Sequence, residues 1–82
     1  MADESFTALQ GQYLAFIHLY TKVNGQPPAE SDMQRYFAVT PPSVHRIVVE
    51  LDRKGLVTRL VGKGRGRSLR VTLDPSALPP LL

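Results

Sequence analysis

The spacing of the apolar residues changes at Gly55, and this change limits the fold more than any other feature of the chain. Before Gly55 the apolar residues recur at steps of three and four, as on one face of a helix, and after it they alternate with polar residues, as in a strand. Gly55 itself is expected to end the last helix in the left-handed conformation that other residues avoid. We predict three helices and then two strands, over residues 8–24, 29–37, 40–54, 56–61 and 68–73.

Two of the predicted helices begin with recognisable caps. Thr7 and Gln10 have the spacing of a capping box, in which the Thr7 hydroxyl accepts from the Gln10 amide and the Gln10 side chain reaches back. Thr40 is a suitable N-cap, and Pro41 suits the first helical position. Because the second helical residue is also a proline, without an amide hydrogen, we expect the Ser43 N–H to donate to the Thr40 hydroxyl.

The predicted core comes from one apolar face of each element. Its aromatic residues are expected to be buried rather than exposed for stacking on bases, because a stacking platform needs exposed rings. The expected core positions are Leu9, Tyr13, Phe16, Ile17, Tyr20 and Val23 in the first helix, Met33 and Phe37 in the second, Val39 in the connection that follows, Val44, Ile47, Val48 and Leu51 in the third helix, and Leu69, Val71 and Leu73 in the last strand.

Acidic and basic residues occupy different parts of the chain, although the formal net charge is only +3. Residues 1–52 hold three bases and six acids, whereas residues 53–73 hold seven bases and no acid. A basic run of this kind predicts a polyanionic partner, although such a run can also be no more than a solvated face.

Size and composition argue against several functional classes. A chain of 82 residues forms one small domain with little room for a deep catalytic cavity, so we expect no enzyme, no cofactor and no small-molecule substrate. With no cysteine and only two isolated histidines, no metal site is expected. The sequence shows no signal peptide and no apolar run of membrane length, so we expect a cytoplasmic, nucleoid-associated protein without a membrane partner.

The predicted order of elements is that of a winged helix-turn-helix, an α+β fold of three helices and a two-stranded antiparallel hairpin, the wing. With the apolar stripe of the third helix turned inward, its exposed side carries Ser43, His45 and Arg46 near the N-terminus and Arg53 further along. Arg46 suits a bidentate contact to guanine in the major groove, and Ser43 and His45 suit base edges or phosphates. His45 can equally be a neutral surface histidine. We therefore expect the protein to bind double-stranded DNA without catalysing a reaction on it.

Residues 62–67 alternate glycine with Lys63, Arg65 and Arg67. Glycine lets a backbone approach phosphate closely, and the cations favour phosphate or a narrow minor groove, so we expect these residues to form the DNA-binding tip of the wing. Their spacing fits neither a dinucleotide-binding loop nor a Walker loop. The alternative is an ordinary flexible hairpin without a ligand.

Three short segments carry a family resemblance: residues 6–7 entering the first helix, Asn-Gly-Gln-Pro-Pro at 24–28, and Leu-Asp-Arg-Lys-Gly-Leu-Val at 51–57. Together they resemble the N-terminal DNA-binding domain of LexA-type repressors, over about residues 6–73. Residues 39–46 are also similar to the recognition helices of MarR-type winged-helix regulators. The resemblance implies sequence-specific binding of a palindromic operator by a homodimer, with contacts from Thr40, Ser43, His45 and Arg46.

The chain departs from the LexA pattern in three respects. LexA repressors carry a C-terminal self-cleaving protease domain that these 82 residues lack, so we expect no induction by self-cleavage. The family's reading helix presents an asparagine and acidic residues where this chain has Pro42, His45 and Arg46. We therefore do not expect this chain to bind the LexA operator. Ala29 stands where the family has a capping threonine, a loss of about 1 kcal/mol unless Ser31 replaces it.

Residues 74–82 form a Pro- and Leu-rich tail after the predicted domain of residues 1–73. One interpretation is a disordered end or a strip packed against the first helix, and the other is a dimer or partner contact through its leucines. Two further functions stay open for the domain as a whole: a protein-interaction adaptor with an acidic partner, and RNA binding.

Overall fold

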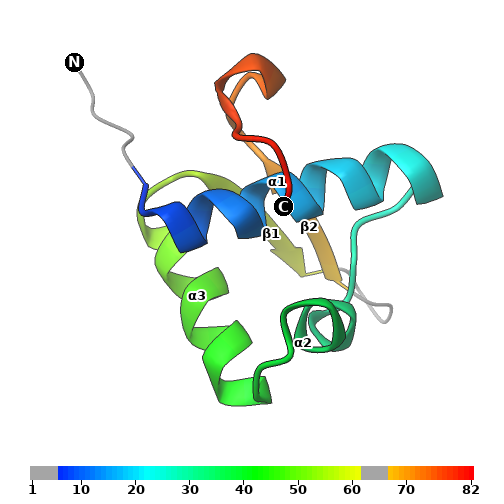
Figure 1. Ribbon diagram of the computed structural model, residues 1–82, viewed down its shortest axis with the longest axis vertical. Helices are drawn as coiled ribbons and strands as arrows, with labels where there is room; N and C mark the ends of the chain where they lie inside the picture. Colours follow the sequence, from blue (N-terminus) through cyan, green and yellow to red (C-terminus); the bar gives the residue numbers. More distant parts are fainter. Residues whose placement is uncertain (1–5, 62–66) are drawn as a thin grey trace.

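The computed structural model describes residues 6–61 and 67–82, which form three helices followed by an antiparallel hairpin (Figure 1). This order confirms the predicted winged-helix α+β fold, and each predicted boundary lies within two residues of the observed one. The elements are α1 (Ala8–Asn24), α2 (Glu30–Phe37), α3 (Pro41–Arg53), β1 (Val57–Val61), β2 (Arg67–Val71) and a 3-10 turn at Pro75–Ala77.

The helix starts follow the predicted chemistry in one case and depart from it in another. At α1 the capping box is confirmed: the Gln10 amide donates to Thr7 Oγ1 at 3.0 Å, and the Thr7 amide donates to Gln10 Oε1 at 3.1 Å. At α3 the prediction is wrong, because the Ser43 N–H donates to the Thr40 carbonyl at 3.0 Å instead of to the hydroxyl. With that donor already satisfied, the Thr40 hydroxyl pairs with the Ser43 hydroxyl at 3.0 Å.

The start of α2 lacks a side-chain N-cap, as the alanine at position 29 implies. Asp32 supplies the other half of a cap: its Oδ2 accepts from the Ala29 amide at 2.8 Å. Arg35 Nη2 in turn lies 2.9 Å from Asp32 Oδ1. Asp32 therefore makes the reciprocal bond of the capping box and does not replace the missing threonine, since the Asp32 amide donates to the Ala29 carbonyl at 3.0 Å.

Two turns, one after α3 and one between α2 and α3, each contain a residue in the left-handed conformation. Gly55 has φ +78°, which confirms its predicted role at the end of α3. Ala38, between α2 and α3, also lies in the left-handed region, at φ 56°, and its N–H donates to the Gln34 carbonyl. A residue with a Cβ is disfavoured there by roughly 1–2 kcal/mol, so the left-handed conformation could not be predicted from an alanine at this position.

The core lies between α1, the inner sides of α2 and α3, and the hairpin. Aromatic rings from α1 and α2 pack against one another here: Tyr13 stacks on Phe37 with ring centroids 4.1 Å apart, and the Phe16 ring lies with its centroid 4.7 Å from that of Tyr36, which is 46% exposed. This confirms the prediction that the aromatic residues of α1 belong to the core. The side chains buried to 2% exposure or less include Leu14, Ile17, Met33, Val44, Val48, Leu51 and Leu56.

Two predicted core positions of α1 are wrong, and so is that of Val39 between α2 and α3, which is 37% exposed. Leu9 is 53% exposed and Val23 is 79% exposed, because both lie in end turns of the helix, past the elements that pack beneath its middle. Leu14, which the predicted stripe left out, is fully buried. The middle of α1 is therefore covered around more of its circumference than one apolar face requires.

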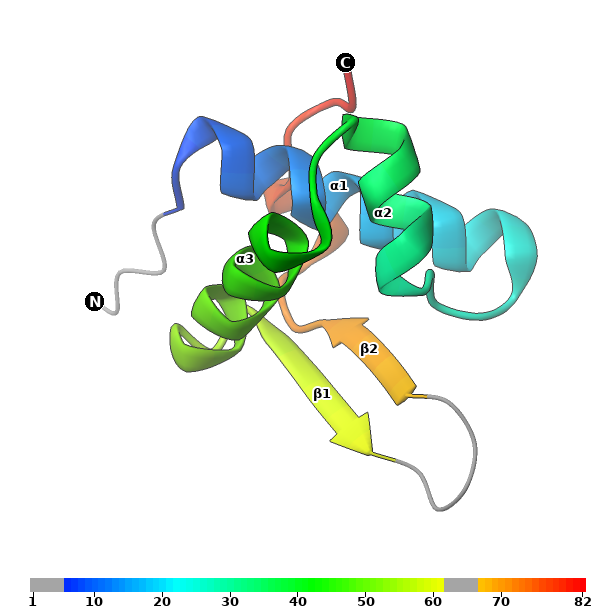
Figure 2. The same cartoon turned by 90° about the horizontal axis from the view of Figure 1, so that it is seen from below.

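The hairpin is antiparallel, with Val57 opposite Val71 and Thr58 opposite Arg70, and it extends beside α3 (Figure 2). Leu69 is buried while Arg70 is exposed, which confirms the predicted alternation of β2. After β2 the chain stays fastened to the end of α3, because the Thr72 hydroxyl donates to the Gly55 carbonyl at 2.7 Å. The wing therefore has a fixed base next to α3.

Residues 74–82, called here the C-terminal segment, pack against α1 and α2. Gln12 holds the segment with both ends of its side-chain amide: Nε2 donates to the Pro80 carbonyl at 2.9 Å, and Oε1 accepts from the Leu82 amide at 2.8 Å. The Tyr36 hydroxyl of α2 donates to the Leu82 carbonyl at 2.7 Å. This supports the packed interpretation of the tail.

Candidate nucleic-acid interface

The packing of α3 decides which of its side chains face solvent. Val44, Val48 and Leu51 are buried against α2 and β1, which fixes the rotation of the helix about its axis. The opposite side, called here the outer face of α3, carries Arg46, Val49, Glu50 and Arg53. This side is available to a partner.

The predicted site residues of α3 lie together at its N-terminal half, except for Arg53. Thr40, His45 and Arg46 are exposed, and Ser43 is half-buried beneath the Thr40 hydroxyl. Arg53 is exposed too, in the last turn. Of the predicted wing residues, Lys63 and Arg65 lie outside the described residues, while Arg67 is placed by its backbone, opposite Val61.

Arg46 and His45 differ in their surroundings. Within the part of the chain that the structure describes, Arg46 makes no hydrogen bond and no ion pair. His45 Nδ1 lies 3.5 Å from Glu30 Oε2 in the first turn of α2, with the imidazole still 60% exposed. Arg46 is thus ready to contact a ligand, whereas His45 has a neighbour within the fold.

Arg53 is bound by Glu50. Its Nε donates to Glu50 Oε1 at 3.2 Å, and its Nη2 contacts Oε2. This hydrogen-bonded pair lowers the pKa of the Glu50 carboxyl below its usual value and raises the pKa of the Arg53 guanidinium. Both groups therefore stay charged at neutral pH.

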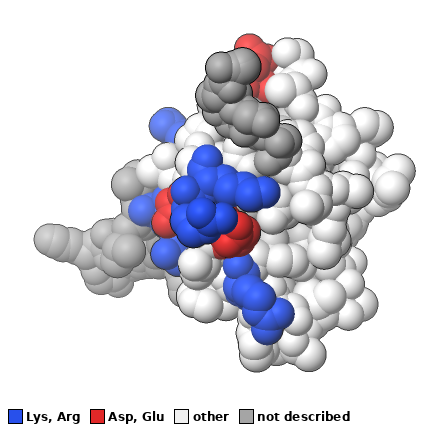
Figure 3. Space-filling view, turned by 90° about the vertical axis from the view of Figure 1, so that its left-hand side faces the viewer, with Lys and Arg blue, Asp and Glu red and all other residues white. Residues whose placement is uncertain are grey.

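A second ion pair joins α3 to the wing, and the sequence reasoning did not single out its arginine. Arg59 Nε of β1 donates to Asp52 Oδ2 at 3.2 Å. Figure 3, which faces α3, shows blue basic atoms gathered on this side of the molecule with red acidic atoms among them. A further tie runs from Lys54 Nζ to Gln10 Oε1 of α1, at 2.8 Å. The surface around α3 is therefore a mixed surface of ion pairs rather than a uniformly basic one.

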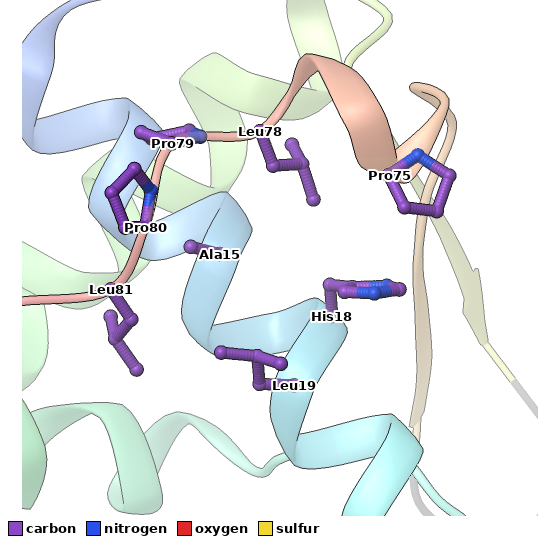
Figure 4. Close-up of a pocket in the computed structure, with 8 residues that line it drawn as sticks. All are labelled: Ala15, His18, Leu19, Pro75, Leu78, Pro79, Pro80 and Leu81. Carbon is purple, nitrogen blue, oxygen red and sulfur yellow. The ribbon is translucent and has the colours of Figure 1, made fainter.

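Other parts of the described chain offer weaker candidates. A hollow of about 370 Å³ lies between α1 and the C-terminal segment, lined mainly by proline and leucine, with His18 as its one titratable side chain (Figure 4). Among residues 6–61 and 67–82 there is no group of three His, Asp or Glu side chains that could hold a metal ion. In the same residues, no helix combines the length and the apolar character needed to cross a bilayer.

Three helices, an antiparallel hairpin and an exposed arginine-bearing third helix define the class of protein, a winged-helix domain of the kind that reads DNA. Residues 3–66 match the family model described as the LexA DNA binding domain. Because this match spans most of the chain, the chain belongs to the LexA DNA-binding domain family. The predicted resemblance is confirmed.

Three relatives, each named LexA repressor, show how far the similarity extends. The protein of Thermotoga neapolitana is 34% identical over 79 residues, that of Oleidesulfovibrio alaskensis 37% over 73 residues, and that of Thermosipho melanesiensis 35% over 78 residues. The alignments cover 96%, 89% and 95% of this chain, but only 39%, 34% and 39% of the relatives. The chain thus spans less than two fifths of the length of each relative.

Proposed function

We propose that the protein is a transcriptional regulator of the repressor type, which binds a specific sequence of double-stranded DNA. In this proposal α3 enters the major groove, and Thr40, Ser43, His45 and Arg46 meet base edges and adjacent phosphates. Arg53, about two helical turns after Arg46, would contact the phosphate backbone. Action on a chromosomal operator would place the protein at the nucleoid.

The observation that carries the proposal is that the Arg46 side chain is exposed and unpaired within the described residues. Its guanidinium is exposed on the outer face of α3 and has no partner among the described residues. A free guanidinium suits the paired acceptors of guanine in the major groove, and no internal ion pair has to be broken before it binds. Membership of a family of DNA-binding domains supports the same conclusion.

The wing supplies the part of the affinity that does not depend on sequence. Lys63 and Arg65, with Arg67, are proposed to contact phosphates or an adjacent minor groove. The antiparallel pairing of β1 with β2, and the bond from Thr72 to Gly55, support this by fixing the base of the hairpin beside α3.

We further propose that two copies bind a palindromic operator. A homodimer would place its two α3 helices on half-sites about one turn of DNA apart, roughly 34–36 Å. The relatives' name, LexA repressor, supports repression as the outcome of binding.

Binding of random-sequence duplexes, followed by fluorescence anisotropy from low to physiological salt, tests the proposal. Submicromolar binding that enriches a palindrome, with two chains per duplex in sedimentation, is the expected result. Weak binding that disappears as salt rises, with no enriched sequence, would contradict it and favour an adaptor for an acidic protein. A preference for single-stranded or A-form RNA would contradict it as well.

A further inference from the structure

The C-terminal half of α3 holds two carboxylates, and each binds one arginine. Glu50 contacts both Nε and Nη2 of Arg53, and Asp52 contacts Nε of Arg59 across the junction with β1. The N-terminal half of the outer face differs, since Arg46 has no partner within the described residues. The cations of one helix surface are thus free at one end and neutralised at the other.

Glu50 lies directly among the arginines that would approach DNA. Positions 46, 50 and 53 are spaced by four and three residues, so they share one side of the helix. The Glu50 side chain is 37% exposed and that of Arg53 is 67% exposed. Any phosphate that reaches Arg53 therefore also meets the Glu50 carboxylate.

The fold itself gives little reason for an acid at this position. Glu50 is not buried, and within the described residues the hydrogen bonds of its carboxylate go to Arg53 of the same helix, three residues on. Exposed pairs of this spacing contribute little to helix stability. The lowered pKa of Glu50 means that its negative charge persists across the neutral range.

We infer that Glu50 limits the sequence-independent part of DNA binding by holding the guanidinium of Arg53. This inference rests on the proposed function. Contacts from arginine to phosphate strengthen binding to every sequence alike, so an unmasked Arg53 would raise affinity for random DNA and for the operator by the same factor. The preference for the operator would stay unchanged, since specificity is a difference between two affinities.

Four variants test this role: Glu50→Gln, Arg53→Gln, the double variant, and Asp74→Asn as the matched control. The control removes one negative charge from the C-terminal segment, away from α3, and asparagine can still cap the 3-10 turn that Asp74 caps. Each variant is titrated with a random duplex and with the enriched operator at several salt concentrations. Thermal unfolding verifies that each is folded, and Glu50→Ala repeats the test with a shorter side chain.

With one more phosphate contact, the salt slope of Glu50→Gln on random duplex should steepen by about 0.9, so that affinity falls about threefold further than wild type between roughly 50 and roughly 200 mM salt. At low salt Glu50→Gln should bind random DNA and the operator more tightly by about the same factor. Asp74→Asn should match wild type, and the double variant should return to the slope of Arg53→Gln.

Two results would overturn the inference alone. One is that Glu50→Gln behaves like Asp74→Asn while wild type still selects an operator. The other is that Glu50→Gln strengthens binding equally in the Arg53→Gln background, which would mean that Glu50 acts without Arg53. A wild-type protein that binds no duplex overturns both this inference and the proposed function.

Discussion

The outer sides of α1 and α3 differ in how far other parts of the chain cover them. On α1, Ala15 is buried and His18 half-buried beneath the C-terminal segment, so that the helix is covered by the core on one side and by the segment on another. On α3, the side away from the core carries Arg46 and Arg53 and stays open. The middle of α1 is enclosed, whereas α3 is covered on one side only.

The side chains on the two helices explain this difference. α1 presents Gly11, where an added Cβ would lie 2.9 Å from Phe6 Cε1 and 3.0 Å from Pro79 Cγ, so the missing side chain is what allows the close approach of the C-terminal segment. α3 presents long charged side chains that would lose hydration under such a cover. We therefore expect changes on α1 to alter stability, and changes on the outer face of α3 to alter binding.

The largest expected effect comes from truncating the enclosed helix. Leu14→Ala should lower the free energy of unfolding by about 2–5 kcal/mol, because Leu14 is fully buried and its removal leaves a cavity. Leu9→Ala is the matched control, the same substitution on the same helix at a site 53% exposed, and should cost well under half as much. Urea denaturation measures both. Equal losses would mean that α1 is not enclosed as described.

Leu14 also shows where sequence reasoning ends. The three helices, the hairpin and the aromatic core follow from periodicity, which is a local property of the chain. Leu14 lies off the regular stripe, and its burial follows from the enclosure of the middle of α1, to which residues more than sixty positions away contribute. Leu9 and Val23 fit the stripe and yet are exposed, because periodicity cannot tell where a helix extends past its neighbours.

The candidate site was predictable to a similar degree. The helical period places His45, Arg46 and Arg53 outward, as observed. The ion pair of Arg53 with Glu50 has a spacing of three residues that could have indicated it. The pair of Arg59 with Asp52 could not have been predicted, since it depends on how β1 meets the last turn of α3.

The second largest effect should appear on the open helix and in binding alone. Arg46→Ala should reduce discrimination between the operator and its base-substituted variants by about 1–3 kcal/mol, because a bidentate contact to guanine is lost. Its free energy of unfolding should change by less than about 0.5 kcal/mol, since the side chain has no partner among the described residues. Competition anisotropy and denaturation, run in parallel, check the two halves of this expectation. If discrimination between the operator and its variants did not change, Arg46 would not be one of the residues that contact bases.

A smaller effect should appear on α1 with the opposite pattern. Gln12→Ala removes both hydrogen bonds to the backbone of the C-terminal segment, at Pro80 and Leu82, and should lower the free energy of unfolding by about 1 kcal/mol. Amide exchange at Leu82 should become faster, while DNA affinity should stay the same. A loss of DNA affinity with no change in Leu82 amide exchange would contradict the expectation that α1 supports the fold and does not contact DNA.

The smallest effect is expected from single cations, and it separates the two sides of the molecule by charge alone. Lys63→Ala should flatten the salt slope by about 0.9 and weaken every duplex alike, because one phosphate contact disappears. Lys22→Ala makes the same charge change in the last turn of α1, where the proposed interface does not reach, and should leave the slope unchanged. Since both variants lower the net charge equally, a general effect of charge would move both slopes together. Such a joint shift would remove the wing from the interface, whereas a change confined to Lys63→Ala would locate the phosphate contacts at the hairpin beside α3.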